Sequence, residues 1–191
     1  MITDPVPRRA ERKREYECSD RLLKVPLPPA QALAAHCRNL EKALADESLK
    51  SVQSAADALA AAVAGAFQSP CPAVKVLGVR PRRVTESSVH ELFGDYDPQT
   101  ARIRLWMRTP VRRQPTSFGT LLSTLCHELC HHFDVVSLGL PNTFHTRGFY
   151  ERAGLLYHHI RRTPPRRLVW VRLAAGRFHI NWAETMRGNE G

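Results

Sequence analysis

The chain has 191 residues, a formal net charge of +10 and a hydrophobic fraction of 43%. This length suits one domain with a sizeable core, and the absence of an apolar run of about 18 residues argues against a membrane protein. The charged N-terminus lacks the apolar segment of a secretory signal, so we expect a cytoplasmic protein whose five cysteines are free thiols.

The first 67 residues divide into a charged segment and a helical one. Residues 1–20 are charged and contain Pro5 and Pro7, so we expect a flexible basic tail. Residues 30–67 are rich in good helix formers, with leucines near helical spacing. They predict one long helix or two consecutive helices, with a break around residues 46–48.

The middle of the chain has strand patterns. Residues 74–79 and 84–92 are candidate strands, and residues 94–99 have the composition of a turn. In residues 101–108, Ile103, Leu105 and Met107 alternate with arginines and a tryptophan, which indicates a strand with one buried face. We expect this strand to be an edge strand that lines a substrate cleft.

Two helices are predicted next. The first has an apolar stripe at helical spacing, Thr116 or Ser117 as its N-cap, and an end near Ser137. The second covers about residues 146–161, and Pro164 and Pro165 prevent its continuation. Residues 168–173 are a further candidate strand, and we expect residues 176–191 to be a loose tail.

The first of these helices contains the motif HExxH, at residues 127–131. Its two histidines are four residues apart, so both imidazoles lie on one face and can bind one ion. Glu128 is rotated to the side, where it can reach a water at the open coordination position. This arrangement is typical of zinc hydrolases, in which the metal lowers the pKa of the water to about 7 and the glutamate is the general base.

A catalytic zinc needs a third protein ligand, and the sequence leaves several candidates downstream. His132 lies about 100° around the helix from His131 and points elsewhere. His145 follows the loop after the helix, whereas Glu151 lies on the second helix and would complete a His-His-Glu site. The other candidates are Asp134, His158 and His159.

Other polar residues near the motif have less direct interpretations. Cys126 and Cys130 face away from the two histidines, so we expect them to pack in the core. Asp134 is either a carboxylate that orients a ligand or a solvated or capping residue. One residue among Tyr157, His158 and His159 could stabilise an oxyanion.

Residues 126–132 (CHELCHH), followed after a loop by His145-Thr-Arg-Gly-Phe149, resemble the SprT-like metallopeptidases. The resemblance covers about residues 101–160. It implies zinc bound by His127, His131 and His145, with Glu128 as the base, and a link to proteolysis of DNA-associated proteins. It also implies an α+β, zincin-like fold in which a small antiparallel or mixed sheet packs on the HExxH helix. The N-terminal helical region, which lies outside the resemblance, is expected from composition.

The expected organisation is a peptidase domain over residues 21–175, with N-terminal helices at 30–67 and a catalytic core at about 74–161. The expected function is that of a zinc metalloendopeptidase that hydrolyses protein or peptide substrates. Nothing in the sequence indicates an oligomeric state.

The arginine-rich stretches 101–120 and 161–177 contain no acidic residue, and such stretches attract polyanions. DNA is therefore a second expected partner. One alternative is a nucleic-acid-binding protein with a structural or inactive zinc site, and another is a peptidase recruited to DNA by its arginines. A structural site would normally have four protein ligands, so the free Glu128 favours the catalytic type.

Overall fold

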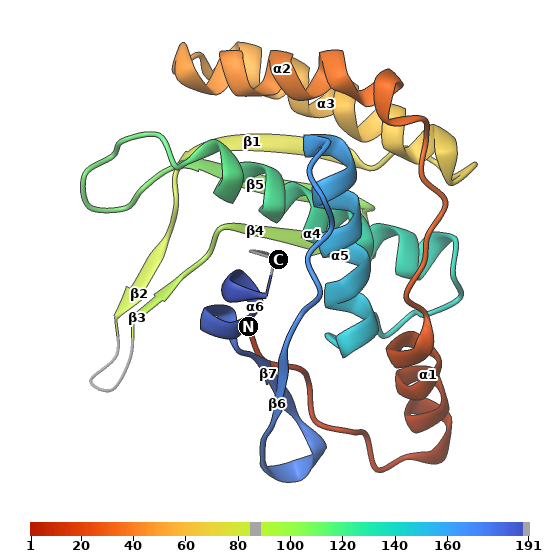
Figure 1. The fold of residues 1–191 in the computed structure, drawn as a ribbon. Helices are drawn as coiled ribbons and strands as arrows, with labels where there is room; N and C mark the ends of the chain where they lie inside the picture. The colour runs from red at the N-terminus through yellow and green to blue at the C-terminus, as the bar shows by residue number, and fades with distance from the viewer. Residues whose placement is uncertain (85–88, 189–191) are drawn as a thin grey trace.

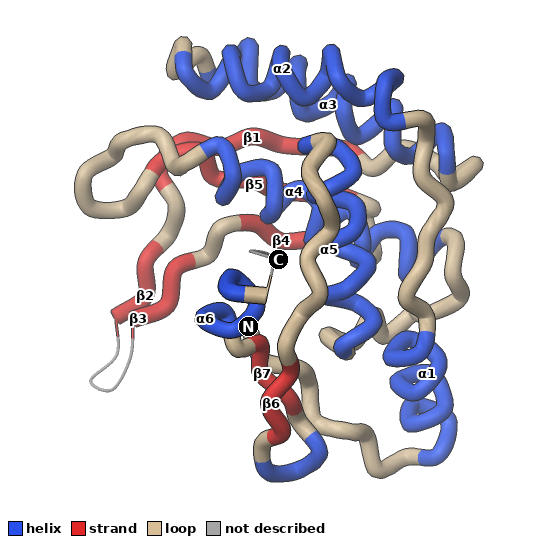
Figure 2. The backbone as a smooth tube through the Cα atoms, in the orientation of Figure 1, coloured by secondary structure: helices blue, strands red, loops and turns tan. Residues whose placement is uncertain are grey.

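The structure, a computed structural model, describes residues 1–84 and 89–188 and has an α+β architecture (Figures 1 and 2). No helix in this described part is long and apolar enough to cross a membrane. The elements are α1 (Ala10–Arg21), α2 (Ala30–Ala45), α3 (Leu49–Ala66), β1 (Ala73–Val79), β2 (Arg82–Val84), β3 (Val89–Glu91), β4 (Gly94–Asp97), β5 (Arg102–Arg108), α4 (Phe118–Val136), α5 (Arg147–Arg161), β6 (Trp170–Arg172), a 3-10 turn (Ala174–Gly176), β7 (Phe178–Ile180) and α6 (Trp182–Arg187).

The predicted helical region is confirmed as two helices, α2 and α3, with a break at residues 46–48. Glu47 has a positive φ of 53°, which a continuous helix does not allow. Ser48 then caps α3, because its hydroxyl accepts a hydrogen bond from the Ser51 backbone N–H. The two helices pack side by side along β1 (Figure 1).

A three-stranded mixed sheet lies in the middle of the molecule, in the order β1–β5–β4. β1 runs parallel to β5 and β4 runs antiparallel to it. Ile103, Leu105 and Met107 in β5 are buried, as the alternation predicted, but Trp106 on the opposite face is buried as well. The outer edge of β1 is covered by α3, whose Gln53 side chain hydrogen-bonds to both Val74 and Val76.

Two expectations about the sheet are wrong. β5 is the central strand, so residues 101–108 do not form an edge strand. The edge strand is β4, in the segment where composition predicted a turn. Its residues pair with β5 through backbone hydrogen bonds, and the turn comes later, where the Asp97 carboxylate accepts hydrogen bonds from Gln99 and Thr100.

The candidate strand at 84–92 falls partly outside the described residues, at 85–88. The described residues on either side of these form the antiparallel pair β2–β3. This pair projects away from the three-stranded sheet (Figure 1).

Helices α4 and α5 have the predicted positions. Ser117 caps α4, and Thr146 caps α5 by accepting a hydrogen bond from the Phe149 backbone N–H. α4 packs on β4 and β5, and α5 packs on α4. Both helices contribute buried residues to the same core, so close packing fixes the position of one helix relative to the other.

The described parts of the two terminal segments, residues 1–20 and 176–188, contact the rest of the fold, although composition predicted a flexible tail at 1–20 and a loose tail at 176–191. The Thr3 backbone N–H donates to the carbonyl of Phe178, and the Ile180 N–H donates to the carbonyl of Met1. Residues 1–3 therefore run beside the β6–β7 hairpin, and α1 packs against α5. These partners are more than 100 residues apart in sequence, which is why local composition did not predict them.

Candidate metal centre

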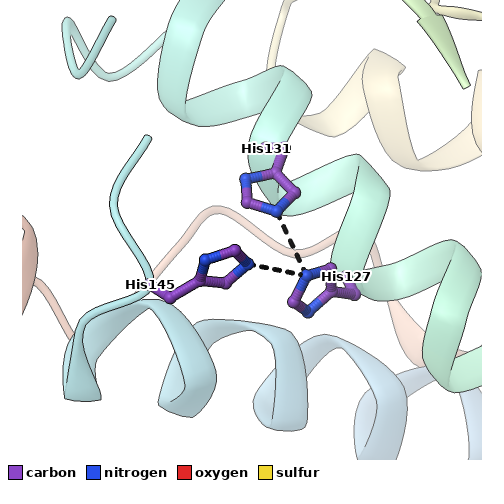
Figure 3. A group of neighbouring side chains, drawn as sticks. All are labelled: His127, His131 and His145. Carbon is purple, nitrogen blue, oxygen red and sulfur yellow. Dashed lines mark hydrogen bonds between the residues drawn. The ribbon is translucent and has the colours of Figure 1, made fainter. Parts of the chain in front are cut away.

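Three histidine side chains converge at one point between α4 and the N-terminus of α5 (Figure 3). The Nε2 atom of His127 lies 3.1 Å from Nε2 of His131 and 3.1 Å from Nε2 of His145. Two nitrogens bound to one tetrahedral zinc, each at about 2.05 Å, would be about 3.3 Å apart. The three nitrogens therefore have a spacing that suits a single metal ion.

Each histidine is placed by local structure that the sequence determines. His127 and His131 are one turn apart on α4, so their rings point in the same direction. His145 directly precedes Thr146, the residue that caps α5, so the start of that helix places its ring beside the other two. The Phe149 ring, fully buried in the first turn of α5, contacts all three imidazoles.

The environment keeps the two α4 histidines unprotonated. Burial, together with the charge of His145, lowers the pKa of His127 to about 3. Burial and the neighbouring His127, His145 and Arg152 lower the pKa of His131 to about 2. A neutral imidazole has a free lone pair, which is the form that binds a metal.

Glu128 is buried between α4 and the edge strand β4, with 5% of its surface exposed. β4 comes this close because residue 94 is glycine: an added Cβ would lie 3.2 Å from Cγ of Glu128 and 2.5 Å from Cγ2 of Thr124. Burial, with a smaller contribution from Asp95, raises the pKa of Glu128 to about 8. The carboxyl group therefore holds a proton more readily than an exposed glutamate does.

Behind His131, a chain of polar groups leads into the core. The Nδ1 atom of His131 lies 2.7 Å from the Thr143 hydroxyl, which donates to Oδ2 of Asp134 at 3.2 Å. Asp134 is fully buried and receives two hydrogen bonds from Arg152. Burial raises the pKa of Asp134 to about 6, and the Arg152 guanidinium opposes this change. Of the two interpretations of Asp134, the structure favours an orienting carboxylate that acts through Thr143.

Behind His145 lie two residues that the sequence analysis missed. Oδ2 of Asp4 is 3.6 Å from Nδ1 of His145 and accepts a hydrogen bond from its backbone N–H at 2.9 Å. The Tyr150 ring stacks on the His145 ring, with centroids 5.7 Å apart. Nothing in the local sequence could have found Asp4, whereas Tyr150 follows the buried Phe149 directly.

The other sequence candidates lie elsewhere. Glu151 accepts a hydrogen bond from the Trp170 indole N–H and is not in the histidine group. His132 is fully buried, contacts the Pro70 carbonyl and the Tyr96 hydroxyl, and is not in the histidine group. Cys126 and Cys130 are buried in the core, as predicted.

The three candidates on α5 for stabilising an oxyanion also lie outside the histidine group. His158 contacts Thr163, and His159 contacts the Pro28 carbonyl. The Tyr157 hydroxyl lies near Gly119, at the start of α4.

Comparisons of the chain with models of protein families, with curated proteins and with solved structures gave no match.

Proposed function

We propose that this protein is a zinc-dependent endopeptidase in which His127, His131 and His145 bind the metal and Glu128 is the general base. The observation that carries the proposal is the convergence of three imidazoles, one of which directly precedes the buried Glu128 on α4. Imidazole nitrogen is a common zinc ligand, and three protein ligands leave the fourth position open, as in catalytic sites. A structural site would need a fourth protein ligand, and the described residues place only these three together.

The free edge of the sheet supports the proposal that the substrate binds in an extended conformation. The edge of β1 is covered by Gln53, whereas in the described part of the chain no strand pairs with the outer edge of β4. β4 runs beside α4 next to Glu128, so a peptide added to this edge would run past the histidines. We infer that this α+β fold is zincin-like, because the edge strand of its sheet lies beside the HExxH helix.

Peptide hydrolysis at this site would combine a bound zinc ion with the side chains around it. When bound, the zinc ion would polarise the scissile carbonyl and lower the pKa of a water molecule to about 7. Glu128, as a carboxylate, would take the proton from the attacking water and pass it to the leaving amine. Thr143 and Phe149 would hold the ligand rings in place.

The direct test compares the wild type with Glu128→Gln and with Glu151→Gln, a matched control on α5. Zinc content is measured in each protein, and cleavage of casein is followed with and without added zinc. We expect equal zinc in all three proteins, with cleavage lost only in Glu128→Gln. Equal cleavage by the wild type and Glu128→Gln would overturn the proposal.

A second measurement addresses the ligands. His145→Ala is compared with His36→Ala, whose histidine lies on α2 away from the cluster. We expect His145→Ala to lose most of its zinc affinity and His36→Ala to retain it. Full zinc affinity in His145→Ala would remove this residue from the ligand set.

The proposed substrates include proteins bound to DNA, because the net charge of +10 and the arginine-rich stretches favour contact with polyanions. The proposed role of DNA is tested by measuring cleavage of a DNA-binding protein with and without duplex DNA at two salt concentrations. We expect DNA to accelerate cleavage at low salt only. DNA binding by a wild type that cleaves nothing would favour a nucleic-acid-binding protein with an inactive zinc site.

A further inference from the structure

We propose that Asp4 is a positioning residue for His145, and that through this one residue the N-terminal segment of residues 1–22 contributes to the metal centre. This inference rests on the metal site of the proposed function and does not require peptidase activity. It concerns a contact between residues 141 positions apart.

Asp4 contacts His145 in three ways. The Asp4 carboxylate accepts a hydrogen bond from the His145 backbone N–H at 2.9 Å, and the Asp4 backbone N–H donates to the His145 carbonyl at 2.8 Å. The same carboxylate oxygen lies 3.6 Å from Nδ1 of the His145 ring. One residue thus contacts both backbone polar groups of His145 and the inner side of its imidazole.

The carboxylate is placed to orient the ring rather than to bind the metal. It faces Nδ1, whereas the Nε2 atom of His145 points to His127. A metal-binding histidine usually donates its second ring N–H to a carboxylate, a carbonyl or water, which fixes the tautomer and the direction of the ring. Thr143 lies at the corresponding place behind His131, at the shorter distance of 2.7 Å from its Nδ1.

The rest of the segment holds Asp4 at this position. Thr3 is paired with Phe178 on one side, and the hydroxyl of Tyr16, on α1, donates to the Asp4 carbonyl. The C-terminal end of α1 is attached to α5, because Asp20 binds both the backbone and the side chain of Arg147. The N-terminal segment is thus held both before and after Asp4, at Thr3 and at Asp20. It can therefore fix the loop that carries His145, although it is remote from that loop in sequence.

Zinc affinity, measured by competition with a chromophoric chelator, tests the proposal. Removing the outer partner of a ligand typically weakens metal binding 10- to 100-fold. Because 41% of the Asp4 side chain is exposed, we expect the lower end of this range, about tenfold, for Asp4→Ala. The matched control is Glu11→Ala, an exposed acidic residue in the first turn of α1, for which we expect no change.

A double-mutant cycle separates positioning from a general effect on folding. If Asp4 acts through His145, Asp4→Ala has no further effect on zinc affinity in a His145→Ala background. Asp4→Asn retains a side-chain oxygen that can accept the hydrogen bond from the His145 backbone N–H. If Asp4→Ala does not fold, the cycle is measured with Asp4→Asn in its place. For Asp4→Asn we expect a smaller loss that also disappears in the His145→Ala background.

Two results would overturn the inference. One is wild-type zinc affinity in both Asp4 variants, and the other is an equal loss with and without His145. Neither result depends on cleavage, so a failure of this inference is distinct from a failure of the Glu128→Gln test. Conversely, the cycle can succeed in a protein that binds zinc and cleaves nothing.

Discussion

Asp134 and Arg152 form an ion pair in which both side chains are fully buried, with Nη2 of Arg152 2.8 Å from Oδ1 of Asp134. The guanidinium also donates to the carbonyls of Ser19 and Leu22, at the end of α1. This pair therefore joins α4, α5 and the N-terminal segment directly behind the histidine cluster. Because the charges have no access to water, each depends on the other.

Replacing Arg152 by methionine should destabilise the protein by about 3–5 kcal/mol, because it leaves the carboxylate of Asp134 buried without its counter-charge. The double variant Asp134→Asn/Arg152→Met should be more stable than Arg152→Met alone. Arg104→Met, at the exposed pair with Asp95, is the control and should cost less than about 1 kcal/mol. Urea unfolding measures all three, and equal losses for Arg152→Met and Arg104→Met would contradict the argument.

Gly94→Ala should reduce peptidase activity much more than zinc affinity. An added Cβ would lie 3.0 Å from the Arg104 carbonyl oxygen and close to Thr124 and Glu128, so β4 must move away from α4. A displacement of about 1 Å at a catalytic group can cost roughly 100-fold in rate. The control is Gly78→Ala in β1, where an added Cβ meets nothing within 4 Å. Unchanged kcat/KM in Gly94→Ala would show that β4 does not position Glu128.

The elements that the sequence predicted well are those whose pattern lies within one contiguous segment. The apolar stripe of α4, the alternation in β5 and the spacing of His127 and His131 are all local, and their interpretations agree with the structure. His145 was one of several open candidates from the residues alone. It joins the cluster because Thr146 caps α5 at that point, which is also a local signal.

The features that the sequence did not predict depend on distant partners. Residues 94–97 have a turn-like composition, but pairing with β5 makes them a strand, and tertiary context overrides such weak local preferences. The N-terminal segment is charged and contains prolines, yet it is ordered by contacts with Phe178, His145 and Arg147. No spacing rule connects Asp4 to a histidine 141 positions away.

The stability of protein stripped of metal should depend on pH in a way that Glu128 controls. The folded carboxyl has a pKa of about 8 against an ordinary value of 4.5, so between these pH values the folded state binds a proton that the unfolded chain has lost. The Glu128 contribution therefore lowers the free energy of unfolding as pH rises, by roughly 1 kcal/mol per pH unit. His127 and His131 act oppositely below pH 6.5, because the unfolded chain then binds protons that the folded rings do not.

Comparing Glu128→Gln with the wild type isolates the Glu128 contribution, since the histidine contributions are present in both proteins. The stability of Glu128→Gln relative to the wild type should increase between pH 4.5 and 8, as measured by urea unfolding in the presence of a chelator. A difference that is constant across this range would mean that the Glu128 carboxyl group is ionised in the folded protein.

Gly148→Ala should detach α1 from the rest of the protein. Gly148 is buried in the first turn of α5, and an added Cβ would collide with the carbonyl oxygens of Ser19 and Asp20, which are backbone atoms that cannot rotate away. Gly154→Ala, on the same helix, is the control, because an added Cβ there meets nothing within 4 Å. That control should be neutral or stabilising by about 0.5–1 kcal/mol, as expected for alanine in a helix.

Limited proteolysis provides the measurement for this pair of variants. Residues 1–22 contain many arginines and lysines, so trypsin should release this segment faster from Gly148→Ala than from the wild type or Gly154→Ala. Because Asp4 belongs to the same segment, zinc affinity should fall together with this protection. Rapid release of residues 1–22 with zinc affinity unchanged would separate α1 from the metal centre and limit the role of the segment to packing.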